Sequence, residues 1–201
     1  MADPTKTPKV FLIVLDGFGV GKDYPFNAIQ HADMPFYRSV SKKYPQARLL
    51  TCGEAVGLPA GVMGNSEVGH MNMGAGRIVY QELTRINKEI RDGNFERNAE
   101  LNTTVEAVKK SGGRLHLMGL LSDAGVHSHL DHLKALITHA SKKVPVTVHA
   151  FTDGRDTPPT SASGYMKQLG EFLRGVPGAV VGSVSGRYFA MDRDNRWDKV
   201  E

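Results

Sequence analysis

The sequence contains very little cysteine and no long apolar run. Cys52 is the only cysteine among 201 residues, so no disulfide can form within the chain, which favours a reducing compartment. The longest apolar run, Val10 to Leu15, is far shorter than the ~20 residues that a membrane-spanning helix needs. It is also too short for a signal-peptide core, and Asp16-Gly17 follows it in place of a small-residue cleavage site. We therefore expect a cytoplasmic protein with no membrane partner.

Clustered charge is also missing. The chain has 25 Lys and Arg residues against 21 Asp and Glu residues, which gives a net charge of +4. No basic run is present, which argues against nucleic-acid binding, and the mild positive charge suits a small anionic substrate. Hydrophobic residues make up 40% and charged residues 23%, as in ordinary folded domains. We expect a monomer of one or two domains.

The apolar residues that are present follow patterns that predict an α/β fold. Helices are predicted over 27–44 (interrupted at Pro35), around Glu67 after a glycine-rich loop over 53–76, over 83–90, over 101–108, over 130–140, over 165–173 and after Met191. Strands are predicted over 9–15, 48–52, 114–121, 145–151 and 179–184. From residue 114 onward strands and helices alternate, which favours a parallel sheet.

Polar side chains follow the predicted strands at the edge where ligands bind in parallel sheets. They are Asp16 after the first strand, His127 in the loop after 114–121, Asp153, Arg155 and Asp156 after 145–151, and Arg187 and Arg193 after 179–184. Arginine forms planar bidentate bonds with carboxylate and phosphate, so this edge is predicted to bind an anion. Alternatively, neighbouring Arg and Asp residues form weak surface ion pairs without function, and residues 191–199 form a solvated helix face.

A second candidate lies in the run from Gly64 to His70. Ser66 stands at the start of a predicted helix between Asn65 and Gly69, where small neighbours give access to its hydroxyl and the helix terminus favours a phosphoryl group. A serine nucleophile needs activation, and metal activation is the simplest option here. Asp16 is a candidate oxygen ligand for that metal. The structural alternatives are a helix cap for Ser66 and a turn-forming role for Asp16.

The segment 127–132 reads His-x-His-x-Asp-His, a spacing found in zinc hydrolases. Such a site needs a further histidine on a distant loop, but His139 and His149 fall within a predicted helix and strand. The apolar residues of the segment also have helical spacing, so the zinc interpretation is disfavoured.

Five motifs occur in order along the chain: Val14-Leu15-Asp16-Gly17, the run from Cys52 to Pro59, the run from Gly64 to His70, Asp153-Gly154-Arg155-Asp156 and Ser185-Gly186-Arg187-Tyr188. Together they resemble the cofactor-independent phosphoglycerate mutases of the alkaline-phosphatase-like superfamily. The resemblance covers nearly the whole chain from Lys9 to Glu201.

This resemblance implies the interconversion of 2- and 3-phosphoglycerate in glycolysis and gluconeogenesis, through a phosphoserine intermediate. It implies Ser66 as the nucleophile, and Asp16 and Ser66 as ligands of two divalent metal ions, expected to be manganese. It implies His127, Arg155, Asp156, Arg187 and Arg193 as substrate-binding residues. It also implies part of a phosphatase-like domain over residues 1–80, followed by part of an inserted substrate-binding domain over 81–201.

Members of that family are much longer than this chain, and their later part supplies most metal ligands. We therefore expect the chain to be a fragment that is inactive by itself. Two other functions stay open: a metal-dependent phosphatase or phosphodiesterase of the same superfamily, and a non-catalytic anion-binding module.

Overall fold

A three-stranded parallel sheet forms the centre of the computed structural model, which describes residues 9–199. Its strands are β1 (Leu115–Leu121), β2 (Val146–Thr152) and β3 (Ala179–Gly186), paired in the order β1-β2-β3. Leu115 lies opposite Val146, and Val146 lies opposite Ala179. This confirms the parallel α/β arrangement predicted from residue 114 onward, and it brings the loops that follow the strands to one edge of the sheet.

The helices between the strands supply the core. α5 (Ala99–Ser111), α6 (Leu130–Ser141) and α7 (Ala162–Arg174) pack their apolar residues onto the sheet. Asn98 caps α5 by accepting a hydrogen bond from the backbone N–H of Leu101 at 3.0 Å, and Gly112 ends that helix in the left-handed conformation. The core includes Val105, Leu121, Leu130, Ile137, Ala140, Val146, Val148, Ala150 and Leu169.

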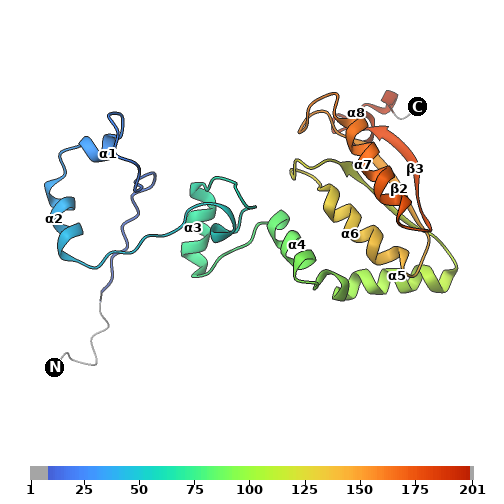
Figure 1. Cartoon of the computed structure of the whole chain (residues 1–201), viewed down its shortest axis with the longest axis horizontal. Helices are drawn as coiled ribbons and strands as arrows, with labels where there is room; N and C mark the ends of the chain where they lie inside the picture. Colours follow the sequence, from blue (N-terminus) through green and yellow to red (C-terminus); the bar gives the residue numbers. More distant parts are fainter. Residues whose placement is uncertain (1–8, 200–201) are drawn as a thin grey trace.

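The first part of the chain holds short helices (Figure 1). They are α1 (Ala28–His31), α2 (Pro35–Lys43), the 3₁₀ turn Gly53–Val56, α3 (Ser66–Ala75), α4 (Glu82–Arg91) and a second 3₁₀ turn over Phe95–Arg97. The predicted break at Pro35 and the helices around Glu67 and over 83–90 are confirmed. No helix of residues 9–199 is long and apolar enough to cross a membrane.

Close backbone contacts at two glycines build the surroundings of α3. Gly57 has a φ of +85°, and a Cβ placed there would lie 2.1 Å from the carbonyl oxygen of Val79. A Cβ at Gly64 would lie 1.7 Å from the carbonyl oxygen of Thr51. Asn72 on α3 adds a bond to the carbonyl oxygen of Val56. The contact of Gly57 with Val79 joins the segment before α3 to the segment after it, and the other two contacts hold the segment before α3 together and against the helix.

The strands predicted over 9–15 and 48–52 are wrong, because both segments are irregular. Phe11 and Ile13 are 88% and 80% exposed, so the first segment lacks the burial that its composition predicts. A strand requires a neighbour that pairs with its N–H and C=O groups. Within residues 9–199 the sheet consists of β1, β2 and β3, and neither segment pairs with it.

The helix predicted after Met191 is also wrong. α8 (Arg187–Ala190) precedes that residue, and only the 3₁₀ turn Trp197–Lys199 follows. The carboxylate of Asp192 accepts hydrogen bonds from the backbone N–H groups of Asp194 and Arg196. Such side-chain bonds compete with helical ones. Asn195, with a φ of 56°, completes the turn. The expected division between residues 1–80 and 81–201 stays a prediction.

Candidate active site

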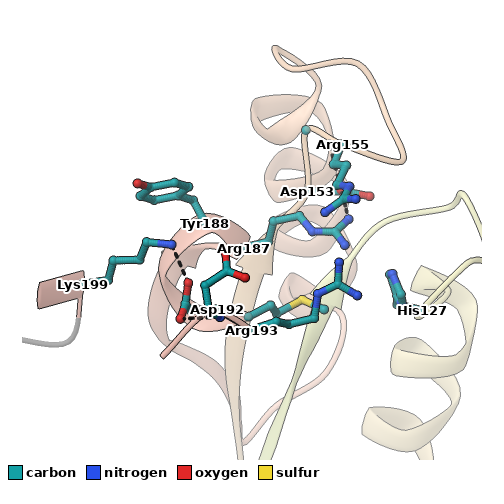
Figure 2. Close-up of a pocket in the computed structure, with 12 residues that line it drawn as sticks. His127, Asp153, Arg155, Arg187, Tyr188, Asp192, Arg193 and Lys199 are labelled. Carbon is teal, nitrogen blue, oxygen red and sulfur yellow. Dashed lines mark hydrogen bonds and ion pairs between the residues drawn. The ribbon is translucent and has the colours of Figure 1, made fainter. Parts of the chain in front are cut away.

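A cleft of about 450 Å³ lies beside the carboxyl ends of β2 and β3 (Figure 2). The loop after β2 supplies Asp153, Gly154 and Arg155, and the segment after β3 supplies Arg187 and Arg193. His127 reaches the cleft from the loop that follows β1. The remaining lining residues are Gly186, Tyr188, Met191, Asp192, Asp194 and Lys199. Parallel pairing thus gathers polar groups from three separate loops, as the sequence predicts.

Arg187 is held in the cleft by two carboxylates. Its Nη1 atom donates to Asp153 Oδ1 at 2.8 Å and to Asp156 Oδ2 at 2.7 Å. The Arg187 side chain is 13% exposed, and that of Asp153 is fully buried. The hydrogen bonds that Arg187 donates to Asp156 and Asp153 raise the pKa of Arg187. Arg187 therefore stays charged and fixed in the wall of the cleft.

Asp153 is charged although it is buried. Burial alone would raise its pKa, but hydrogen bonds from the backbone N–H of Arg155 and the side chain of Arg187 outweigh that cost and lower the pKa to about 2. The N–H groups of Arg155 and Asp156 lie 3.0 and 3.1 Å from its Oδ1 atom. Asp153 therefore shapes the turn after β2 as well as holding Arg187.

Arg155, Arg193 and His127 also line the same cleft. In Figure 2 the guanidinium groups of Arg187 and Arg193 and the ring of His127 point toward a common space, with Arg155 next to Asp153. Among residues 9–199, Arg155 and Arg193 form no side-chain ion pair. The Nε2 atom of His127 lies 3.7 Å from Asp156 Oδ2. The arrangement offers several donors to an oxyanion.

The opposite wall of the cleft is closed by an ion pair. Lys199 donates to Asp192 Oδ1, and its Nζ atom lies 4.0 Å from the centre of the Tyr188 ring. The Lys199 bond and the N–H of Arg196 lower the pKa of Asp192 to about 2. This pair orders the irregular segment that carries Arg193 (Figure 2). The sequence pattern gave no role to Asp192 or Lys199, because nothing periodic connects them.

Ser66 and Asp16 meet elsewhere in the molecule. Ser66 is the first residue of α3, and its Oγ donates to Asp16 Oδ2 at 2.6 Å. Asn65 caps the helix by accepting from the N–H of Val68 at 3.0 Å, so Ser66 itself is not the cap. Both side chains of the pair are exposed. The contact forms although Asp16 does not stand at the end of a strand.

The donor chemistry of this pair fits part of a divalent-metal site. A carboxylate and a hydroxyl oxygen are ligands that hard cations prefer, and here they are within 2.6 Å of each other. Within residues 9–199 no three His, Cys, Asp or Glu side chains gather closely enough to hold a metal. Asp16 and Ser66 can therefore contribute to such a site and cannot complete it.

The His-x-His-x-Asp-His segment does not form a common site. His127 faces Asp156, His129 accepts from the N–H of Asp131 as the cap of α6, and His132 contacts Asn87 Oδ1 at 2.7 Å. The predicted helix, α6, begins at Leu130. His129 caps this helix, and His132 connects it to α4 through Asn87.

The predicted site residues thus form two groups. Asp16 and Ser66 lie together, and His127, Arg155, Asp156, Arg187 and Arg193 lie at or beside the cleft. Figure 1 shows α3 well separated from α8 and the end of β3, so the two groups do not meet in this structure.

A family model described as "BPG-independent PGAM N-terminus" (iPGM_N) matches residues 86–201, which is more than half of the chain. The chain belongs to this family. Its three-stranded parallel sheet lies within the matched region, so the α/β fold class predicted from the sequence is confirmed.

The chain is similar to curated proteins named 2,3-bisphosphoglycerate-independent phosphoglycerate mutase. The relative from Moorella thermoacetica is 56% identical over 193 residues, and the one from Clostridium beijerinckii is 52% identical over 194 residues. The alignments cover 95% and 96% of this chain and 38% of each relative. The chain therefore spans a little over one third of the length of the relatives it matches.

Among solved structures, the chain is similar to a crystal structure of Leishmania mexicana phosphoglycerate mutase at low cobalt concentration. The TM-score is 0.60 at 37% sequence identity, and the match covers 93% of this chain and 36% of that chain. The family resemblance stated from the motifs is confirmed by these matches.

Proposed function

We propose that this chain is the nucleophile-bearing and substrate-binding portion of an enzyme that interconverts 2- and 3-phosphoglycerate through a phosphoserine. The observation that carries the proposal is the 2.6 Å hydrogen bond from Ser66 Oγ to Asp16 Oδ2. These residues are 50 positions apart, and the fold brings a hydroxyl at a helix N-terminus to a carboxylate. The similarity to named phosphoglycerate mutases supports the substrate.

In the proposed reaction the Oγ atom of Ser66 forms a bond to phosphorus, and the ester bond between phosphorus and the glycerate oxygen breaks. The glycerate then takes the phosphoryl group back on its other hydroxyl, which regenerates Ser66. As the bond to phosphorus forms, the serine hydroxyl gives up the proton that it donates to Asp16 Oδ2, and the departing glycerate oxygen takes up one proton. The return transfer reverses both proton movements, so that no proton is gained or lost overall. The N-terminus of α3 stabilises the negative charge of the phosphoryl group. Two divalent ions, which we propose to be manganese, would neutralise charge on the phosphoryl oxygens.

The cleft supplies the second half of the proposed site. The glycerate carboxylate and the phosphate are both anionic, and Arg155, Arg187 and Arg193 offer guanidinium groups around one space. Asp156 and His127, 3.7 Å apart, can accept from or donate to the glycerate hydroxyls. The cleft thereby holds the glycerate while the phosphoryl group changes oxygen.

Transfer requires the cleft and Ser66 to approach each other, because Ser66 begins α3 and Figure 1 shows α3 far from α8 and the end of β3. We therefore propose that the two groups of residues come together during the reaction. Closure also excludes water, which would otherwise hydrolyse the phosphoserine. Because the single cysteine is an exposed thiol, we propose the cytoplasm as the compartment.

The test uses a chimera in which residues 1–201 replace the matching part of the Moorella thermoacetica relative. A coupled assay should detect conversion of 3-phosphoglycerate by the chimera and none by the 201-residue chain. Ser66→Ala should abolish conversion, because it removes the attacking oxygen. Ser39→Ala, which removes an exposed helical hydroxyl, should leave conversion unchanged. Normal turnover by the Ser66→Ala chimera would disprove the nucleophile assignment.

The same assay separates the main rival. A phosphatase would release inorganic phosphate from 3-phosphoglycerate, whereas a mutase moves the phosphate and keeps the total of esterified phosphate constant. The cleft favours the mutase, because it holds three arginines that a simple phosphatase does not require.

A further inference from the structure

Asp153 is the buried acidic residue of the cleft to which the proposed reaction gives no task. It is the first residue after β2, and its side chain is fully buried. Its Oδ1 atom accepts three hydrogen bonds, from the N–H groups of Arg155 and Asp156 and from Nη1 of Arg187. Two of these bonds shape the turn after β2, and the third crosses to the residue that follows β3.

The bond to Arg187 determines which edge of the guanidinium is free. The group has five donor hydrogens in a planar fork. Nη1 is shared between Asp153 and Asp156, at 2.8 and 2.7 Å. Among residues 9–199, Nε and Nη2 of Arg187 have no hydrogen-bond partner. The edge formed by these two atoms can bind two oxygens of one anion.

Because the Nε–Nη2 edge is fixed before the ligand arrives, binding loses less side-chain conformational entropy. An unrestrained arginine side chain loses free rotation about several bonds when it binds an anion. Arg187 has already lost them, because both carboxylates hold one end of the group and its side chain is only 13% exposed.

We propose that Asp153 is a positioning residue: its buried carboxylate holds Nη1 of Arg187 so that the Nε–Nη2 edge is presented to the anion bound in the cleft. The inference rests on the proposed function for the identity of that anion. Asp153 touches no substrate itself and acts through Arg187.

The direction in which anion affinity changes when Asp153 is replaced tests this inference. If Asp153 acted only through its charge, its removal would tighten binding of an anion, because a negative charge would leave the cleft. If it positions Arg187, its removal weakens binding. Asp153→Asn suits the test, since the amide oxygen can still accept from both backbone N–H groups and from Nη1 of Arg187, while the charge that strengthens the bond to Arg187 is lost.

The first measurement is a calorimetric titration of the 201-residue chain with 3-phosphoglycerate. Because the ion pair becomes a bond from a cation to a neutral amide, the hold on Nη1 weakens, and Asp153→Asn should weaken binding about fivefold to tenfold. The matched control is Asp194→Asn, which removes one charge from the lining of the same cleft without touching Arg187, and it should tighten binding. Unchanged or tighter binding by Asp153→Asn overturns the inference.

The second measurement repeats the titration in an Arg187→Met background. If Asp153 acts through Arg187, adding Asp153→Asn to this background should weaken binding no further. An equal weakening in both backgrounds would show that Asp153 acts by another route and would overturn the inference.

The third measurement needs no ligand. Nitrogen-15 NMR of the wild-type chain should resolve separate Nη1 and Nη2 signals for Arg187, because two carboxylates restrain the rotation of its guanidinium. Averaged signals from a freely rotating group would overturn the inference. If the wild-type chain does not bind 3-phosphoglycerate, the proposed function fails, and the positioning role is still decided by whether Asp153→Asn averages the two Arg187 signals; signals as well separated as in the wild-type chain would overturn it.

Discussion

At the scale of single residues, the charge of Asp153 links stability to pH. Its pKa is lowered from 3.8 to about 2 in the folded chain. Between these values the unfolded chain binds more protons than the folded chain, so the stabilisation is present above pH 3.8 and is lost as the pH falls toward 2. We predict that Asp153→Asn flattens the decline of the melting temperature over this range, measured by circular dichroism.

The control for this prediction is Asp194→Asn. The Asp194 carboxylate forms no ion pair within residues 9–199. Its removal should therefore leave the melting temperature falling with pH as steeply as in the wild-type chain. An Asp153→Asn variant with the full wild-type slope would mean that the Arg187 pair does not survive in solution.

The sequence motifs predicted some features of the cleft but not others. The motifs indicated Arg155, Asp156 and Arg187, and the structure brings them to one edge of the sheet. Their roles in binding stay predictions. The anchoring by Asp153 and the pair of Asp192 with Lys199 depend on distances across loops, which a residue pattern does not contain.

At the scale of elements, the placement of α3 depends on glycines that leave room for a neighbouring backbone. Gly57→Ala would combine a positive φ with a Cβ 2.1 Å from the Val79 carbonyl oxygen. We therefore predict that it lowers the free energy of unfolding by about 1–3 kcal/mol or more. Hydrogen exchange measured by mass spectrometry should show faster exchange in peptides within residues 53–80, because the contact between the two segments is lost.

Gly69→Ala is the matched control within α3 itself. A Cβ at Gly69 would meet nothing within 4 Å, and alanine stabilises a helix interior by about 0.5–1 kcal/mol relative to glycine. The same substitution should therefore slow exchange in α3. Equal acceleration by both variants would contradict the packing argument.

The elements that were predicted correctly differ from the others in one physical respect. α5, α6 and α7 satisfy their backbone groups locally, and β1 to β3 find each other within a short stretch of chain. The segment 9–15 has the composition of a buried strand but finds no pairing partner within residues 9–199. Composition indicates that a strand is favourable, whereas pairing decides whether it forms.

At the scale of the whole molecule, burial is uneven along the chain. Leu169 and Ile137 are fully buried beneath the sheet, whereas Phe11 and Ile13 are more than three quarters exposed. The family match begins at residue 86 and contains the whole sheet. The sequence alone could not predict this difference, because both regions contain similar apolar runs and only tertiary contacts separate them.

This difference predicts a large effect of substitution by alanine at one isoleucine and almost none at another. Ile137→Ala would leave a cavity in the core and should lower the free energy of unfolding by about 2–5 kcal/mol. Ile13→Ala removes an exposed side chain and should change it by less than about 0.5 kcal/mol. Urea denaturation followed by circular dichroism measures both values. A comparable loss for the two variants would show that residues 10–15 are buried in solution and that stability extends well beyond the sheet.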